Sequence, residues 1–185
     1  MADSLKLTPA SALHISRHMI AAHGLIPNTS IQSRPLLIYH SAFEPSSVTP
    51  AALEEHLHAV GAVVPQWRYT MYPTSHFHST THEVLAVSWG AARLCFGGDD
   101  NPAKVEPTVR KGDVIVVPAG VAHRLIKDLN EGGESFEMVG SYPPGCNWDM
   151  CYGNAGEQDV AERIAKIPWF ERDPVYGDSG PVLED

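Results

Sequence analysis

Short apolar segments, separated by turns rich in glycine and proline, make up the middle of this chain. Closely spaced short strands without helices between them predict an antiparallel sandwich or barrel. The expected strands cover residues 36–39, 67–72, 76–78, 83–88, 92–96, 105–109, 114–117, 122–126 and 135–141. The fold class predicted from this pattern is all-β.

Three other segments have the apolar spacing of helices. Residues 9–24 end at Gly24, a residue suited to a helix C-terminus, and predict an N-terminal helical segment. Residues 50–60 begin with Pro50 and predict a second helix. Residues 156–166 predict a last amphipathic helix, and we expect the Pro-, Gly- and Asp-rich chain after it to be extended.

No linker or repeat interrupts the chain, and 185 residues are enough for one domain. We therefore expect a single domain over residues 1–185. Its strand-rich barrel would cover about 33–145, with the helical segment 9–24 before it and the C-terminal helix and tail, 156–185, after it.

The net charge of −9 comes from 13 Lys and Arg against 22 Asp and Glu. An acidic surface repels phosphate backbones and anionic lipids, so we expect no nucleic-acid partner and no membrane partner. The first residues lack the basic-then-apolar order of a signal peptide, which favours a cytoplasmic protein. Its three cysteines, Cys95, Cys146 and Cys151, are expected to be reduced thiols.

The stretch from His76 to Glu83 carries the most distinctive chemistry. His76 and His78 are two residues apart, so on a strand both imidazoles would lie on the same face. A short turn could bring Glu83 back to the same point, and a later strand and tight turn supply His123. Imidazole nitrogens with a carboxylate oxygen suit a divalent Fe, Mn, Ni, Zn or Cu ion.

These two segments resemble the two motifs of the cupin superfamily. The matching positions are His76, His78, Glu83 and Gly90 in the first motif, and Gly112, Pro118, Gly120 and His123 in the second. The resemblance implies a jelly-roll barrel, the RmlC-like double-stranded β-helix, with flanking N- and C-terminal helices. It also implies one divalent transition metal held by His76, His78, Glu83 and His123.

More narrowly, the run from His76 to Leu85 is similar to small uncharacterised single-domain cupins of the YjlB type. Cupins with three His and one Glu include dioxygenases, decarboxylases, lyases and isomerases. The resemblance implies a metal-dependent enzyme with a small-molecule substrate, and the oxidoreductase (dioxygenase) class is favoured by analogy. A metal-dependent isomerase, lyase or decarboxylase, a non-catalytic binding protein and a metal-free barrel remain alternatives. Cupins commonly pair barrels through sheet edges, so a homodimer is also expected.

Several neighbouring residues have two interpretations. Glu83, His82 or a tyrosine could transfer a proton. His82 could instead be structural, since alternation along a strand turns it away from Glu83. Arg124 could face outward or pair with a substrate carboxylate.

Other residues raise the same choice between packing and function. The alternating residues Trp67, Tyr69 and Met71 could be core or could cradle a substrate. Cys146 and Trp148 could pack or form part of a lid, and Cys146 and Cys151 could form a metal or redox pair.

Overall fold

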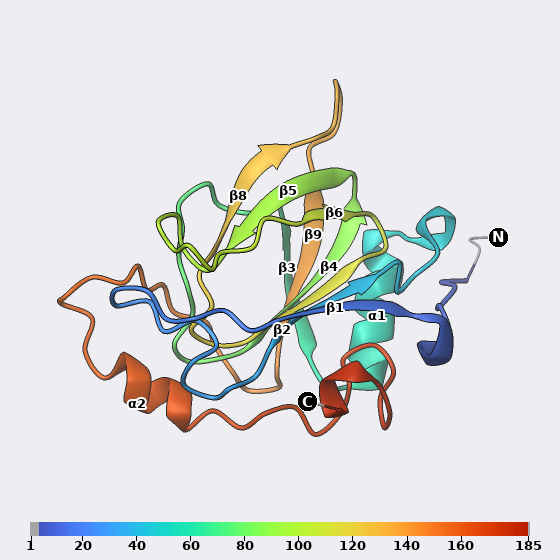
Figure 1. The fold of residues 1–185 in the computed structure, drawn as a ribbon. Coiled ribbons are helices and arrows are strands. Elements are labelled where there is room, and N and C mark those ends of the chain that lie inside the picture. The colour runs from blue at the N-terminus through green and yellow to red at the C-terminus, as the bar shows by residue number, and fades with distance from the viewer. Residues whose placement is uncertain (1–3, 185) are drawn as a thin grey trace.

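The computed structural model describes residues 4–184 and contains two antiparallel sheets (Figure 1). The larger sheet has the order β1 (His14–His18), β2 (Leu36–His40), β7 (Val114–Val117), β4 (Glu83–Trp89), β9 (Glu137–Tyr142) and β3 (Val64–Tyr69). The smaller has the order β6 (Thr108–Arg110), β5 (Ala91–Phe96) and β8 (His123–Asp128). This arrangement confirms the predicted all-β class and is consistent with a jelly roll.

Alternation along the central strand β4 divides the core into two layers. Leu85 and Val87 face the smaller sheet and join the inner apolar cluster. Val84 and Ala86 face the other way and join an outer cluster. The larger sheet is therefore buried on both faces, which explains why β2, β4 and β7 are rich in apolar residues and almost wholly buried.

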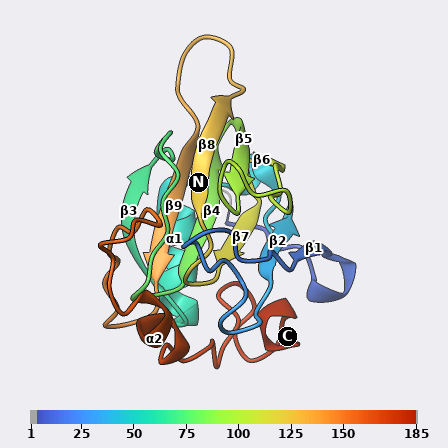
Figure 2. The same ribbon diagram turned by 60° about the vertical axis from the view of Figure 1, so that its left-hand side comes forward.

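Two further segments, the helix α1 and the C-terminal chain, cover the outer face of the larger sheet (Figure 2). The helix α1 (Pro50–Val60) begins after Thr49, whose hydroxyl accepts a hydrogen bond from the Ala52 N–H, and buries Leu53 and Leu57. The chain after residue 168 adds the apolar side chains Phe170, Val175 and Val182. Three short 3-10 helices, η1 (Ala10–Ala12), η2 (Pro45–Ser47) and η3 (Pro181–Leu183), complete the connections.

The predicted helix at 9–24 is wrong. This segment contains η1 followed by β1, which pairs antiparallel with β2 from His14–His40 to His18–Leu36. Pairing with the free edge of β2 satisfies a row of backbone groups, and this tertiary gain outweighs a weak local helical pattern. Gly24 does adopt a positive φ of 56°, but within a turn between His23 and Ile26.

The other helices agree better with the prediction. The helix predicted at 50–60 is α1, and the one predicted at 156–166 is the shorter α2 (Val160–Ala165). The tail after residue 168 is not extended throughout, because it turns between Asp173 and Gly177 and then forms η3. The predicted strand at 76–78 is reduced to isolated bridges.

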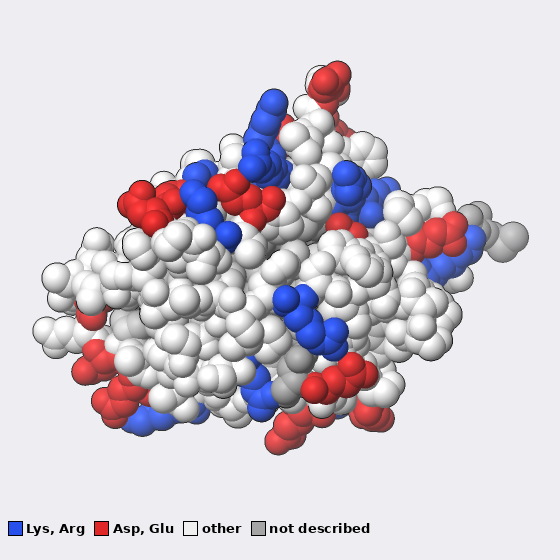
Figure 3. Space-filling view, in the orientation of Figure 1, with Lys and Arg blue, Asp and Glu red and all other residues white. Residues whose placement is uncertain are grey.

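Charged side chains of both signs are interspersed on the face drawn in Figure 3. The net charge of −9 therefore does not form a single acidic patch on this face. Among residues 4–184, no helix has the length and apolar character needed to cross a membrane.

Candidate metal centre

Glu83 is the first residue of β4, and the alternation of that strand directs it into the barrel. It lies on the same face as Leu85, while His82 lies on the face of Val84. The Glu83 side chain is 3% exposed, so its carboxylate needs partners inside the barrel.

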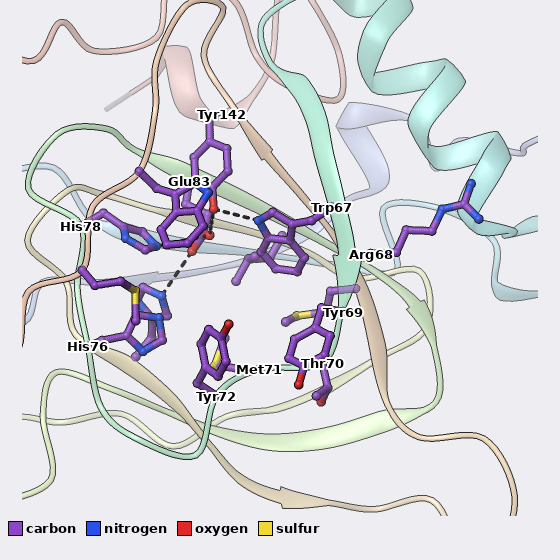
Figure 4. A pocket seen from close by; sticks show the side chains of 15 residues that line it. Trp67, Arg68, Tyr69, Thr70, Met71, Tyr72, His76, His78, Glu83 and Tyr142 are labelled. Atoms are coloured by element: carbon purple, nitrogen blue, oxygen red, sulfur yellow. Dashed lines mark hydrogen bonds and ion pairs between the residues drawn. The ribbon is translucent and has the colours of Figure 1, made fainter.

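His76 and His78 reach the same point from the segment before β4. The backbone of His76 exchanges two hydrogen bonds, of 2.8 and 3.2 Å, with that of His123 at the start of β8. Phe77, between the two histidines, packs with Ala122 and Cys151. Because Phe77 points away, both imidazoles point toward Glu83 (Figure 4).

Backbone carbonyl groups fix the orientation of all three imidazoles. The Nδ1 atoms of His76, His78 and His123 lie 2.9, 2.5 and 2.9 Å from the carbonyl oxygens of Thr74, Asp149 and Val121. A carbonyl oxygen can only accept, so each Nδ1 carries a hydrogen and each neutral ring keeps its lone pair on Nε2. This is the tautomer that a metal-binding histidine needs.

Glu83 is held by a short hydrogen-bonded chain on its other side. The Tyr142 hydroxyl donates to Glu83 Oε1 at 2.8 Å and accepts a hydrogen bond of 2.8 Å from Trp67 Nε1. The close approach of Trp67 depends on Gly140, where a Cβ atom would lie 2.0 Å from the indole ring. Glu83 Oε2, by contrast, is buried and makes no hydrogen bond.

The three histidines are close enough together that they could hold one metal ion, and Glu83 lies next to two of them. The three histidines offer ring nitrogens within 4.8 Å of one another. Glu83 Oε1 lies 3.4 Å from His78 Nε2, and Oε2 lies 3.3 Å from His123 Nε2. Two atoms bound to one ion at about 2.1 Å are separated by about 3.0 to 3.4 Å at right-angle to tetrahedral geometry. The buried Oε2 without a hydrogen bond is also the atom that a cation would satisfy.

Electrostatics favour a positive charge at this position. Burial lowers the pKa of His76 to about 4, which keeps its lone pair available. Burial alone would raise the pKa of Glu83 and lower that of His78, but their mutual attraction reverses both shifts. The site therefore favours an ionised Glu83 with a cation beside it, which is either a protonated His78 or a bound metal ion.

Asp149, which sequence reasoning did not single out, anchors the irregular chain beside His78. Its carboxylate accepts hydrogen bonds from the Ser79 N–H at 2.7 Å and the Ser79 hydroxyl at 2.5 Å. Arg163 of α2 donates to the same hydroxyl at 2.9 Å. This network positions the carbonyl group that orients His78.

A cavity of about 260 Å³ lies in front of the histidines and Glu83 (Figure 4). The alternating residues Trp67, Tyr69 and Met71 all contribute to its wall, so this stripe does more than fill the core. Trp148 also borders the cavity.

His82 is not brought to the cavity. Its buried ring packs against Trp169 and Phe170, at 4.8 and 5.5 Å between centroids. Its Nδ1 accepts a hydrogen bond from the Ala119 N–H, and its Nε2 faces the Pro168 carbonyl without a hydrogen bond of good geometry. This placement matches the structural interpretation of His82 and gives it no access to a ligand in the cavity.

Arg124 and the cysteines do not line the cavity. Arg124 faces outward and pairs with Asp99 at 2.5 Å. Cys95, Cys146 and Cys151 are free thiols.

Comparison with known proteins identifies the family. The Cupin family model matches residues 46–142. This chain belongs to the cupin family. The cupin is 30% identical over 162 residues to the uncharacterised protein YjlB of Bacillus subtilis (strain 168), covering 87% of this chain and 90% of YjlB. It is also 33% identical over 87 residues to auxin-binding protein ABP20 of Prunus persica, covering 47% of this chain and 36% of that protein.

Solved structures similar to this cupin are more distant. The 11S globulin of Wrightia tinctoria is 12% identical with a TM-score of 0.35, covering 82% of this chain. A mutant of Bacillus subtilis oxalate decarboxylase is 14% identical with a TM-score of 0.35, covering 76% of this chain. The cupin spans 30% and 27% of the length of those two chains, respectively.

Proposed function

We propose that this cupin is a metal-dependent enzyme that acts on a small molecule. One divalent transition metal would be held by His76, His78, Glu83 and His123. One observation carries this proposal. Backbone carbonyls hold the Nδ1 atoms of three imidazoles, and a buried carboxylate oxygen without a hydrogen bond lies next to these rings. A divalent metal in such a site supplies Lewis acidity and, if it is iron or manganese, one-electron chemistry with O₂.

The rest of the chain binds and shields the substrate. Three histidines and one carboxylate leave two positions free on a six-coordinate ion, and the cavity gives a small molecule access to that side. Leu85, Met138 and Trp67 in the cavity wall exclude water from the reacting atoms. Tyr142 holds Glu83 in one orientation through its hydroxyl.

Within this proposal we favour a dioxygenase-type oxidoreductase over proton-transfer chemistry. The carboxylate of Glu83 already accepts from Tyr142. Burial raises the pKa of Tyr142 far above its usual value, so that hydroxyl keeps its proton. His82 lies outside the cavity. These three groups are thus either occupied or distant, which favours a reaction driven by the metal and O₂ unless Tyr72, at the border of the cavity, moves the proton.

A lyase, isomerase or decarboxylase is the alternative within the enzyme class, and Tyr72 is the residue that supports it. Tyr72 borders the cavity, with its ring 5.7 Å from that of His76, and its hydroxyl is the candidate for moving a proton. A Tyr72→Phe variant should then lose turnover and change its pH profile. If the protein is an oxygenase, the same Tyr72→Phe variant should keep most of its turnover.

A non-catalytic binding protein is the other alternative, and it is favoured by the name of the auxin-binding relative. A binding protein would show saturable ligand binding without product and without consumption of O₂.

The first experiment is elemental analysis of protein purified without an affinity metal column. We expect one equivalent of transition metal in the wild type and none in His76→Ala/His78→Ala. The matched control is His14→Ala/His18→Ala, which removes two histidines from β1 outside the cavity and should keep the metal. A wild-type protein that takes up no Fe, Mn, Ni, Cu or Zn when each is offered contradicts the proposal.

A second measurement addresses the reaction class. Protein loaded with iron or manganese should consume O₂ when a chelating substrate is added, and the double variant should not. Turnover without O₂ uptake would favour the lyase, isomerase or decarboxylase alternative.

A further inference from the structure

Apart from the metal-binding side chains, Arg68 and Thr70, the wall of the cavity is aromatic and apolar. Its aromatic and thioether residues are Trp67, Tyr69, Met71, Tyr72, Met138, Tyr142, Trp148 and Met150. Such a wall favours a ligand with a flat apolar body, because rings stack on rings and thioethers.

No cationic side chain is available inside this cavity to pair with a ligand carboxylate. Among the described residues that line it, Arg68 is the only Lys or Arg. Its guanidinium makes two hydrogen bonds, of 2.6 and 2.7 Å, to the Glu54 carboxylate of α1. Figure 4 shows its side chain directed away from the cavity toward that helix.

The charge balance of the metal centre then limits the charge of the ligand. A divalent ion with Glu83 and three neutral imidazoles leaves one net positive charge. A ligand with one negative charge neutralises it, whereas a small dianion leaves one uncompensated negative charge against an apolar wall. Burying an unpaired charge in such surroundings is costly.

The shape of the cavity limits the size of the ligand. Its volume of about 260 Å³ is just below the range of about 300 to 1,000 Å³ typical of sites for drug-sized ligands. The rings of Tyr69, Tyr72 and Trp148 at its border are 53%, 48% and 44% exposed. A chelating head with one ring would fill the cavity and place the ring among these three side chains.

We propose that the ligand of this site is a monoanionic bidentate oxygen chelator carrying a single aromatic or similarly flat apolar group, and not a small dicarboxylate. The inference rests on the proposed metal centre. It narrows the substrate class that the metal centre alone leaves open.

Three probes separate the contribution of the chelating group to affinity from that of the apolar group. Acetohydroxamate and benzohydroxamate share one chelating head, which loses one proton on binding, and differ in a methyl or a phenyl group. Oxalate carries two negative charges and no apolar body. Titration calorimetry on protein loaded with one equivalent of cobalt(II) gives each affinity, and the visible spectrum of the cobalt reports that the metal stays bound.

We expect benzohydroxamate to bind about tenfold tighter than acetohydroxamate, because the phenyl group buries more apolar surface. Oxalate should bind more weakly than either. In Trp148→Ala the ratio between the two hydroxamates should fall toward one, while acetohydroxamate keeps its affinity. The matched control is Trp89→Ala, because Trp89 is equally exposed, at 43%, and does not line the cavity. This variant should keep the tenfold ratio.

Any of three results would overturn the inference while leaving the metal centre intact. One is oxalate binding at least as tightly as benzohydroxamate. The second is a hydroxamate ratio near one in the wild type, and the third is a ratio that Trp148→Ala does not change. A wild-type protein that binds neither cobalt nor Fe, Mn, Ni, Cu or Zn overturns both proposals, and elemental analysis identifies that case before any ligand is added. If one of these metals binds and cobalt does not, the titrations use that metal.

Discussion

The chain continues beyond β9 in an extension of two parts that lie on different sides of the barrel. The first part is residues 143–166, and the second part is residues 168–184. The first part borders the proposed metal centre, with Trp148 at the cavity and the Asp149 carbonyl on His78. The second part covers the outer face of the larger sheet, where Phe170 and Val175 join the outer cluster.

One aspartate anchors each part, and the two aspartates differ in burial. Asp173 is 0% exposed and accepts hydrogen bonds from the Tyr39 hydroxyl and from the N–H groups of Val175, Tyr176 and Val182. The Asp149 side chain is 29% exposed. A buried, fully bonded carboxylate contributes mainly to stability, whereas a partly exposed one beside a ligand contributes mainly to the geometry of the site.

The largest expected effect is that of Asp173→Ala on stability. The substitution removes a carboxylate that accepts hydrogen bonds from the buried Tyr39 and from three backbone N–H groups. We expect the free energy of unfolding to fall by about 3 to 4 kcal/mol, measured by denaturant titration. The metal content of the folded variant should stay at one equivalent.

Asp178→Ala is the control for that prediction. Asp178 lies on the same tail, is 89% exposed and pairs with Arg172 at 2.9 Å. A surface pair of this kind contributes at most about 1 kcal/mol. Equal destabilisation by the two substitutions would show that Asp173 does not anchor the tail.

The second largest expected effect is a loss of metal affinity caused by a substitution in residues 143–166. Asp149→Ala removes the acceptor of both Ser79 hydrogen bonds and loosens the segment whose carbonyl orients His78. We expect metal affinity to fall about tenfold, as for other residues that orient a ligand, measured by competition with a chelator. The free energy of unfolding should fall by only about 1 to 2 kcal/mol.

Glu157→Ala is the matched control for Asp149→Ala. The Glu157 carboxylate also accepts backbone hydrogen bonds within the extension, from Tyr152, Gly153 and Asn154, but it does not touch the histidines or Ser79. Its substitution should leave metal affinity unchanged. If both variants lose metal equally, the whole extension, and not Asp149, supports the site.

The direction in which each candidate metal-binding side chain faces could be predicted from sequence, because it follows from local geometry. The meeting of His123 with His76 and Glu83 is implied only by the resemblance to cupins, since it depends on pairing between distant segments. Alternation places His76 and His78 on one face, and it separates His82 from Glu83. The second histidine segment follows from a tight turn at Gly120, whose positive φ of 92° a glycine adopts readily. These features depend on residues within one strand or one turn.

The parts that could not be predicted depend on contacts between distant segments. The carbonyl that orients His78 comes from Asp149, 71 residues later, in a segment without regular structure. The strand β1 forms because an edge of β2 is free, which the local pattern of 14–18 does not reveal. Periodicity reports which face of an element is apolar, but it does not report what lies opposite.

The smallest expected effect is that of Tyr142→Phe, which tests support for the metal centre from within the barrel. The substitution removes the donor to Glu83 Oε1 and the acceptor of Trp67 Nε1. Both atoms border an open cavity, so water can replace the hydroxyl, and we expect metal affinity to fall about threefold, for a net cost of about 0.5 to 1 kcal/mol. The control is Tyr69→Phe, which removes a hydroxyl from the 53% exposed ring at the border of the same cavity and should not change metal affinity. A loss for Tyr142→Phe as large as that for Asp149→Ala would mean that the barrel supports the ligands as much as the extension does.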